Sequence, residues 1–515
     1  MKDTSPTISF KEYIFNNRQN KTVLLSAGIA ILIQLVVFKY LYPFASFIHY
    51  DSFVYLGTAY LNLDINSYMV GYSRFLRLFS AFTSSDTALV TFQYILVQCS
   101  ALFFLFTLYY FYRPGKVMQI LLLCFMVLNP LFLYMANTVS SDCFFLAISF
   151  IWFSLLLWTI HQPSTQIIIW NILALFIAFT VRYNALIYPF ITALAFLLSR
   201  LPMRKKIAGM AAGTLLCVLF ILYTGNKYKA LTGSWQYAPF SGWQLANNAM
   251  YAYRYVDSTD RKPVPKKFKA LDNSIRVYFD STRDVNKYPV EGLRASTFYM
   301  WRHDLPLFKY RDLQFSKDST SSDLKKWASM GPLYGEYGIY IIKQYPEYYI
   351  RHFLLPNAGK YYAPPVEYLE TYNSGKDSVA PIAQEWFGYK SLKVTTRMKD
   401  LKISALDFYP ILSGIMNVVF LCALLCIIIL HGFRSNTLFR KGIVLAASLW
   451  LLNAGFSIFS TAGALRFLAF PILLMCTFAI LLIDLMWKIA MNEKMESLRL
   501  ESKKSQKVEK NALAG

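Results

Sequence analysis

The sequence predicts an all-α membrane protein: a polytopic bundle of about ten transmembrane helices with a large domain outside the membrane. Of the 515 residues, 56% are hydrophobic and 16% are charged, a composition too apolar for a soluble globular protein of this length. About ten apolar runs reach the roughly 20 residues that a helix needs to cross about 30 Å of hydrocarbon. A domain-sized stretch, 225–404, separates the first seven runs from the last three.

The apolar runs are expected to be the membrane-spanning helices. They cover residues 22–43, 87–112, 117–136, 142–160, 166–181, 184–199, 206–224, 405–430, 441–459 and 465–488. The fifth and sixth runs are short and only VRYN separates them, so a broken or re-entrant pair is the alternative to two crossings. A long polar stretch precedes the first run and no small-residue cleavage site follows it, so we expect a retained helix and not a cleaved signal peptide.

Basic residues gather in short loops that lie on one side of the membrane if there are ten crossings. The loops are 113–116, 200–206 and 431–441, and both termini are also basic. By the positive-inside rule this side is the cytoplasm, so both termini are expected there. Topology thus accounts for the net charge of +23, and we do not expect nucleic-acid binding.

The expected topology divides the chain into four parts. Residues 1–224 form an N-terminal transmembrane module whose first outer loop, 44–86, lies on the extracytoplasmic side. Residues 225–404 form an extracytoplasmic α or α+β domain, 405–491 form the C-terminal transmembrane helices, and 492–515 form a cytoplasmic tail.

The first outer loop is expected to carry two short helices. In FIHYDSFVYLGTAYL, Asp51, Tyr55 and Ala59 recur at i, i+4 and i+8, so they share one face of a helix. The following stretch, YMVGYSRFLRLFSAF, has the apolar spacing of an amphipathic helix that lies on the membrane surface. Its basic residues Arg74 and Arg77 are three apart, so they can point the same way.

Ionisable residues at helix ends are the main candidates for chemistry. The sequence has no P-loop, Rossmann glycine fingerprint, nucleophile elbow or zinc-protease helix, and its seven cysteines all lie in or beside apolar segments. The topology sends four charged residues to the outer face: Asp51, Asp142, Arg182 and Arg466. Because charges at membrane depth usually face a protein interior or a water-filled cavity, together they predict a site. Taken singly, each acid is also typical of a helix cap, and each arginine of a side chain that reaches the lipid headgroups.

Four segments of the chain resemble one known family. HYDSFVYLGTAYL places Asp51 ahead of a surface helix with D-x-x-x-Y-x-x-x-A spacing, and NPLFLYMANTVSSDCFF contains Asp142. TVRYNALIYPF contains Arg182 before a proline-bearing helix, and GALRFLAFP contains Arg466 in an Arg-x-x-x-x-Pro segment. In these segments the chain resembles the GT-C membrane glycosyltransferases, the superfamily of protein O-mannosyltransferases and lipid A aminoarabinose transferases. Ser52 stands where protein O-mannosyltransferases usually have a second acid, which weighs against the protein-mannosylating branch.

The resemblance implies an inverting enzyme of the bacterial cytoplasmic (inner) membrane with its active site on the extracytoplasmic face. It would move a sugar from a polyprenyl-phosphate donor to a hydroxyl of a protein, lipid or glycan acceptor, in contact with membrane lipid. Asp51 would be the general base. Arg182 and Arg466, and after them Arg74 and Arg77, would bind the donor phosphate.

The resemblance leaves the role of Asp142 open. Its carboxylate would orient the acceptor, position a cationic residue, or hold a divalent cation, Mg or Mn, together with Asp51. Tyr55, Trp243 and Trp301 are expected to contact the sugar or the acceptor, whereas aromatic residues of a large loop more often belong to its core.

Other functions stay open at this point. A transporter or flippase of lipid-linked sugars would also have charges near helix ends, but it would normally show repeats and midplane ionisable residues. A polysaccharide polymerase or ligase of a different membrane fold would use its large outer loop, where the candidates are Arg302, His303, Arg351 and His352. A non-catalytic partner subunit is the third alternative.

Overall fold

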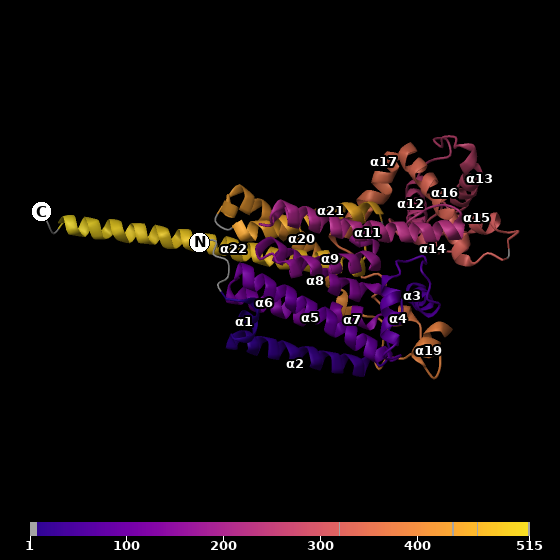
Figure 1. Cartoon of the computed structure of the whole chain (residues 1–515). Helices are drawn as coiled ribbons and strands as arrows, with labels where there is room; N and C mark the ends of the chain where they lie inside the picture. Colours follow the sequence, from indigo (N-terminus) through magenta and orange to yellow (C-terminus); the bar gives the residue numbers. More distant parts are fainter. Residues whose placement is uncertain (1–7, 319, 435–436, 461, 513–515) are drawn as a thin grey trace.

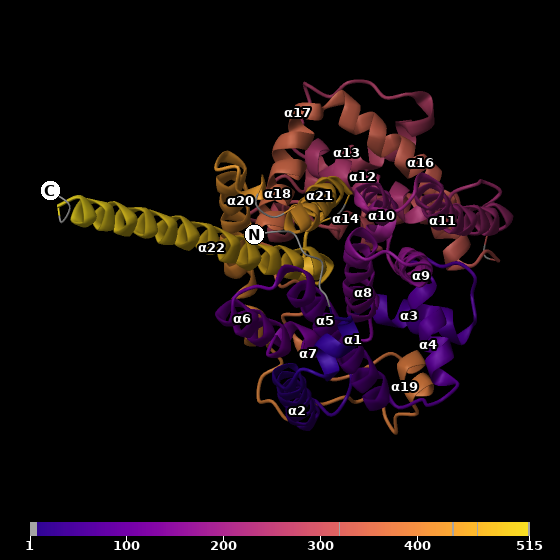
Figure 2. The same ribbon diagram turned by 60° about the vertical axis from the view of Figure 1, so that its left-hand side comes forward.

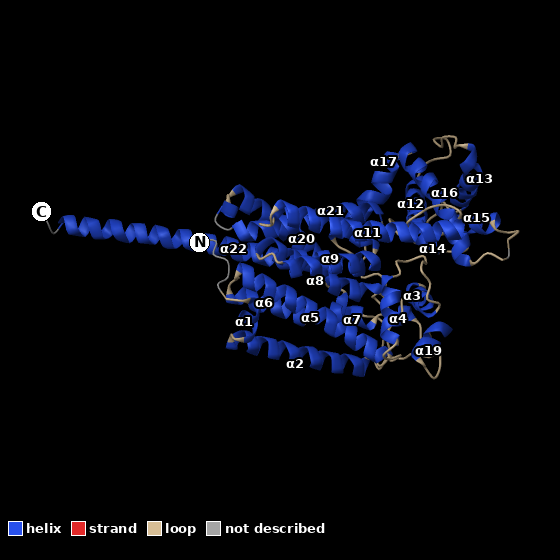
Figure 3. Cartoon of the chain, viewed as in Figure 1, coloured by secondary structure: helices blue, strands red, loops and turns tan. Residues whose placement is uncertain are grey.

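The chain is almost entirely helical. The computed structural model describes residues 8–318, 320–434, 437–460 and 462–512, and within these ranges it contains helices and isolated β-bridges but no strand (Figure 3). The all-α prediction is therefore confirmed for the described residues. Residues 225–404 were expected to form an α or an α+β domain, and the described residues of this range are all-α.

Eight of the described helical segments are long and apolar enough to cross a membrane, which identifies an integral membrane protein. They are α2 (Arg18–Leu41), α5 (Asp86–Tyr112), the pair α6 (Lys116–Val127) and α7 (Pro130–Asn137), α8 (Ser141–His161), α11 (Met203–Thr232), α20 (Tyr409–Ile429), α21 (Thr437–Ser460) and the first part of α22 (Leu465–Ala512). Each coincides with one predicted run. α22 continues beyond its apolar part, so the predicted tail is helical as far as Ala512.

The fifth and sixth predicted helices form a shorter pair. α9 (Thr165–Val181) is followed by the 3₁₀-helix η1 (Tyr183–Ile187) and by α10 (Tyr188–Leu198), and neither arm has the length of the eight spans. The pair nevertheless extends along the bundle. Its last carbonyl, that of Leu198, accepts a hydrogen bond of 2.8 Å from Lys441 near the start of α21, at the end opposite to the turn between α9 and η1.

The third predicted helix is broken in two. α6 ends at Val127 and α7 begins at Pro130, because proline lacks the N–H that a continuous helix needs. The side-chain oxygen of Asn129 caps α7 by accepting from the N–H of Leu131 at 3.0 Å. The same oxygen also accepts from the hydroxyl of Tyr409 on α20, so a neighbouring helix holds the break in place.

α8 lies at the centre of the bundle. It contacts α5, α9, α10 and α22 and is buried along nearly its whole length, as is the apolar part of α22 (Figure 2). A helix that is apolar on all faces is stable where other helices surround it. α2 and α11 are mostly exposed, and many of their exposed side chains are apolar, which suits contact with lipid.

The elements outside the bundle gather at one of its ends, while α1 (Phe10–Phe15) and the far end of α22 lie at the other (Figure 1). The first outer loop contains α3 (Asp51–Tyr60) and α4 (Gly71–Ser80), and α19 (Pro381–Phe387) lies against α3. The larger group consists of α12 (Pro239–Tyr253), α13 (Lys269–Ser281), α14 (Phe298–Trp301), α15 (Pro306–Gln314), α16 (Asp323–Gln344), α17 (Pro346–Tyr349) and α18 (Leu355–Tyr362).

Residues 225–404 contribute to two hydrophobic cores and not to one. α12 to α17 pack around their own core, which includes Trp243 and Tyr334. The chain after α18 joins the core of the membrane bundle, with Tyr372 among its buried residues. The range therefore contributes an outer helical domain and most of a second segment, 363–408, that lies against the first outer loop.

α12 and α16 approach each other closely at a glycine contact. A Cβ atom on Gly242 would overlap the carbonyl oxygen of Gly331, which is backbone and cannot turn aside. We expect Gly242→Ala to lower the free energy of unfolding by about 2 kcal/mol. Thermal unfolding of the purified protein in detergent, followed by tryptophan fluorescence, measures this.

Gly359 on α18 provides the matched control. A Cβ atom at this position would have no described atom within 4 Å. Gly359→Ala should therefore leave the stability unchanged or raise it slightly, because alanine favours the helix. Equal losses in the two variants would contradict the close helix contact as the cause.

Candidate active site

Hydrogen bonds hold the first outer loop next to the turn that leads into α8. The N–H of Ser46 donates to the carbonyl of Asn137 at 2.8 Å, and the N–H of Val139 donates to the carbonyl of Ser46 at 2.9 Å. From the other side, the N–H of Asn373 donates to Oγ of Ser46 at 2.9 Å. These bonds bring the start of α3 next to the start of α8, although the two are far apart in the sequence.

Asp51 is the first residue of α3, where the helix dipole favours a negative charge. The chain enters this helix through Tyr50, whose φ of 71° is a strained conformation for a bulky residue. One carboxylate oxygen of Asp51 accepts from the hydroxyl of Tyr68 at 2.6 Å, and the other accepts from Arg466 at 2.6 Å. Both oxygens of this carboxylate are therefore held in a defined orientation.

Two arginines and two aspartates form a buried network of ion pairs. Arg466 bonds to Asp51 at 2.6 Å and to Asp142 at 3.1 Å, and Arg182 pairs with the other oxygen of Asp142. The side chains of Arg466 and Asp142 are 5% and 3% exposed, against 19% for Asp51. The network joins α3, α8, the end of α9 and the start of α22. All four charged residues that the sequence places at the outer face thus meet.

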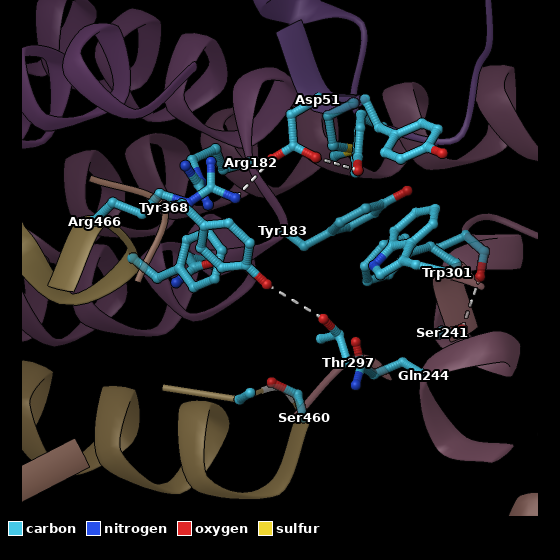
Figure 4. A pocket seen from close by; sticks show the side chains of 18 of the residues that line it. Asp51, Arg182, Tyr183, Ser241, Gln244, Thr297, Trp301, Tyr368, Ser460 and Arg466 are labelled. Carbon is cyan, nitrogen blue, oxygen red and sulfur yellow. Dashed lines mark hydrogen bonds and ion pairs between the residues drawn. The ribbon is translucent and has the colours of Figure 1, made fainter. Parts of the chain in front are cut away.

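A cavity of about 690 Å³ lies beside the network. Asp51, Arg182 and Arg466 belong to its wall, and Figure 4 shows their side chains close together. The other walls come from η1, α12, α14, the end of α21 and the segment after α18. They are largely aromatic, with Tyr68, Tyr183, Tyr237, Phe240, Trp301, Tyr368, Phe456, Phe459 and Phe467. A mainly apolar cavity with a few convergent charged groups is the usual form of a small-molecule site.

The protonation states of the network favour an anionic ligand. Burial lowers the pKa of Arg182 to about 10, which leaves its guanidinium charged at neutral pH. Burial, together with the Asp51 carboxylate, raises the pKa of Tyr68 well above its usual value, so its hydroxyl stays a donor. Nε of Arg466 is buried without a hydrogen-bond partner among the described residues. The guanidinium groups of Arg182 and Arg466 in the cavity wall are therefore the groups that can attract an anion.

Asp142 lies behind the arginines and is not part of the cavity wall. Oγ of Ser140 also donates to its carboxylate at 2.8 Å. Of the roles that the sequence leaves open, this geometry favours the positioning of Arg182 and Arg466. In this structure the carboxylates of Asp51 and Asp142 bind guanidinium groups and not a shared cation position. The described residues also include no group of three or more His, Cys, Asp or Glu side chains suited to a metal.

Arg74 and Arg77 do not line the cavity, unlike the other two arginines expected to bind the donor phosphate. Arg74 pairs with Asp64 at 2.8 Å, and Arg77 donates to the carbonyl of Ala59 at 2.9 Å. α4 packs its apolar face, with Leu76, against the bundle, and this turns the two arginines toward the connection between α3 and α4. Their side chains hold that connection in place.

Tyr55 and Trp301 line the cavity, whereas Trp243 does not. Trp243 is completely buried in the outer helical domain, where its Nε1–H donates to the carbonyl of Trp327 at 2.9 Å. Successive residues of a helix point about 100° apart, so α12 turns Trp243 inward and presents its neighbour Gln244 to the cavity. The expectation that Trp243 contacts a sugar is therefore corrected.

No pattern in the sequence marks several further residues of the cavity wall. These are Tyr68, Tyr183, Gln244, Thr297, Tyr368 and Ser460. They are uncharged residues of common types from separate parts of the chain, so neither spacing nor composition singles them out. The one available signal is the amide-rich stretch WQLANN, which is unusually polar for the inner face of an aromatic domain.

No protein-family model matches the chain, and neither a curated protein nor a solved structure is significantly similar to it. The cavity and the residues that line it are therefore the basis on which a function is inferred.

Neutralising Asp142 should destabilise the protein, because two buried guanidinium groups would then share a single carboxylate. We expect Asp142→Asn to lower the free energy of unfolding by about 3 kcal/mol, measured by thermal unfolding in detergent. The matched control is Glu336→Gln, which breaks an ion pair with Lys267 whose side chains are 58% and 57% exposed. It should change stability by less than about 1 kcal/mol. An Asp142→Asn variant as stable as this control would show that the arginines do not need the carboxylate.

Proposed function

We propose that the protein is a membrane glycosyltransferase that moves a sugar from a polyprenyl-phosphate donor to an acceptor hydroxyl. The observation that carries the proposal is the shared wall of Asp51, Arg182 and Arg466 in a mainly aromatic cavity at the ends of apolar helices. A carboxylate, two cations and an apolar surround suit a substrate that combines a hydroxylated group, a phosphate and a lipid chain. The resemblance to GT-C glycosyltransferases leads to the same reaction.

The two arginines are suited to bind the donor phosphate. A guanidinium group presents several N–H donors in a plane, which matches phosphate oxygens. Arg466 lies over the rings of Tyr368 and Phe467, at 4.5 and 4.4 Å from their centroids, and its Nε lacks a partner among the described residues. When the phosphate binds, Arg466 exchanges its bond to Asp51 for one to a phosphate oxygen. This exchange frees the carboxylate to act as a base.

The reaction is a direct displacement that inverts the anomeric carbon. The acceptor oxygen forms a bond to this carbon while the bond from the carbon to the phosphate oxygen breaks, and the electron pair leaves with the phosphate. Asp51 takes the proton of the acceptor hydroxyl. Tyr68 keeps the carboxylate oriented, and Arg182 and Arg466 stabilise the negative charge on the leaving phosphate. Asp142 is a positioning residue, because it acts through the arginines.

The proposed site faces the extracytoplasmic side of a bacterial cytoplasmic membrane. The positive-inside rule assigns the basic loops 113–116, 200–206 and 431–441 and both termini to the cytoplasm. α1 and the far end of α22 lie at the end of the bundle opposite to the outer helical elements (Figure 1). Counting α9 and α10 as crossings gives ten, which their extension along the bundle supports. A lipid-phosphate donor suits this location, since nucleotide sugars are not expected outside the cytoplasm. The acceptor is a hydroxyl of a protein, lipid or glycan.

The geometry gives less support to a polymerase or ligase centred on the large outer loop. Of the four candidates for such a site, Arg302 lines the cavity, but Asp304 binds it through two hydrogen bonds of 2.9 and 2.7 Å. His303, Arg351 and His352 are not part of the cavity wall, and both histidines lie against aromatic rings. A transporter is also less well supported, because the network lies at helix ends and not at mid-depth.

Asp51→Asn should reduce sugar transfer at least about 100-fold, because an amide cannot take the acceptor proton. The assay uses purified protein in lipid nanodiscs, a radiolabelled polyprenyl-phosphate sugar and a membrane extract, and it measures label in the acceptor. Asp64→Asn is the matched control in the same outer loop, where Asp64 pairs with Arg74 and Lys227 outside the cavity. Turnover by a folded Asp51→Asn variant equal to that of this control would remove Asp51 from the mechanism.

Arg466→Ala should impair use of the donor more than use of the acceptor. We expect the donor KM to rise, or kcat/KM for the donor to fall, by about 100-fold, with a smaller change for the acceptor. Arg466→Lys should lie between the alanine variant and the native protein, since lysine keeps the charge but loses the planar fork. Arg74→Ala controls for the loss of a positive charge nearby. Equal losses for donor and acceptor would mean that Arg466 has only a structural role.

A further inference from the structure

One end of the cavity carries polar groups that the proposed mechanism does not use. Gln244, Thr297 and Ser460 line it, and Figure 4 shows them on the side away from Asp51. Gln244 is only 4% exposed. Its Oε1 and the Oγ of Ser460 are both buried and have no hydrogen-bond partner among the described residues. Since unpaired buried polar atoms cost free energy, a ligand that displaced the groups packed over them and paired with them would gain stability.

A network of amides fixes the orientation of Gln244. Nδ2 of Asn248 donates to the carbonyls of Phe459 and Ser460 at 3.3 and 3.2 Å, at the end of α21. Its Oδ1 must then face Gln244, whose Nε2 donates to it at 2.7 Å. A flipped Gln244 amide would set two oxygens against each other, so its Oε1 is directed away from Asn248 and remains an acceptor. The amide of Gln244 is therefore fixed in orientation, and its Oε1 remains an unpaired acceptor in a residue of the cavity wall.

The same amides hold the third member of the polar end. Nδ2 of Asn247 donates to the carbonyl of Ser296 at 2.8 Å and to Oδ1 of Asn248 at 3.1 Å. This fixes the backbone next to Thr297. Three separate parts of the chain, α12, the loop before α14 and the end of α21, thus present their polar atoms in a fixed arrangement.

A single tyrosine ring separates the polar end from the arginines. The guanidinium of Arg466 lies 4.5 Å from the ring centroid of Tyr368, and the hydroxyl of Tyr368 lies 3.4 Å from Oγ1 of Thr297 (Figure 4). Tyr368 therefore contacts both ends of the cavity, Arg466 with its ring and Thr297 with its hydroxyl. A sugar attached to a phosphate at Arg466 would lie along Tyr368 and reach the polar end.

The charges around the cavity favour an uncharged sugar. Of the two acids in its wall, Asp51 lies away from the polar end, and Glu367 is paired with Lys360 at 3.5 Å. An ammonium group at the polar end would lose its hydration without gaining a free opposite charge among the described residues. A carboxylate would meet the acceptor oxygen of Gln244. Hydroxyl groups, which both donate and accept, suit an amide oxygen and two hydroxyls.

We propose that Gln244, Thr297 and Ser460 bind the hydroxyl groups of an uncharged sugar on the polyprenyl-phosphate donor. This inference rests on the proposed glycosyltransferase function and adds the class of sugar, a neutral one in place of an amino sugar or a uronic acid. The phosphate occupies the arginine end, and the ring of Tyr368 is the wall along which the sugar lies.

The test compares the binding of lipids with and without a sugar to the purified full-length protein in nanodiscs. The probes are undecaprenyl phosphate, the same lipid carrying glucose, mannose or galactose, and the same lipid carrying 4-amino-4-deoxyarabinose. We expect at least one hexose lipid to bind more tightly than the bare phosphate and the amino-sugar lipid. Gln244→Leu should weaken that hexose lipid about tenfold and leave the bare phosphate unchanged. Ser460→Ala should act in the same direction.

Ser241→Ala is the matched control for the subsite. Ser241 lies on the same helix and lines the same cavity, but its hydroxyl already donates to the carbonyl of Ala238 at 2.7 Å. Its loss should change hexose-lipid binding little. Thermal unfolding of each variant shows whether the protein is still folded.

Three outcomes would overturn the inference. The class of sugar is wrong if the amino-sugar lipid binds as tightly as the best hexose lipid. The subsite is wrong if no hexose lipid binds more tightly than the bare phosphate, or if Gln244→Leu affects all lipids equally or none of them. In each of these cases the proposed function still stands if Arg466→Ala weakens the bare phosphate. A native protein that binds none of the lipids would instead contradict the proposed function itself.

Discussion

The ion pairs that Asp142 makes with Arg182 and Arg466 are the constraint on which the rest of the site depends. Buried charges are tolerated only when they are paired, so the start of α8, the end of α9 and the start of α22 must meet in one arrangement. Asp51 joins the same network through Arg466 and brings the first outer loop with it. Because these residues come from both ends of the chain, the wall of the cavity forms only when the whole bundle is assembled.

The elements outside the membrane complete this wall by hydrogen bonding and by aromatic packing. Segment 363–408 holds the first outer loop, and the amides of α12 hold the end of α21 and the loop before α14. The result is a cavity with cations at one end, unpaired neutral polar atoms at the other, and aromatic rings between them. This division matches a substrate whose phosphate, sugar and lipid chain each need a different surrounding.

Hydrophobicity predicts the membrane part of the fold well but not its irregularities. Each of the ten apolar runs coincides with a helical segment, because only helices satisfy their own backbone within lipid. The break between α6 and α7 was not predicted, because the run 117–136 suggests one continuous helix, although Pro130 begins the second part. The split of 225–404 between two cores was not readable, since it depends on which neighbours each part contacts in the folded chain.

By itself, the sequence determines which charges are unusual: Asp51, Asp142, Arg182 and Arg466 stand out because charged residues at the ends of apolar helices are costly unless they are paired. Only the tertiary structure decides where each side chain points. It buries Trp243 in a domain core, keeps Arg74 and Arg77 outside the cavity and turns Gln244 into it. The physical reason is that the direction of a side chain depends on which face of its helix is packed, and long-range contacts set that packing.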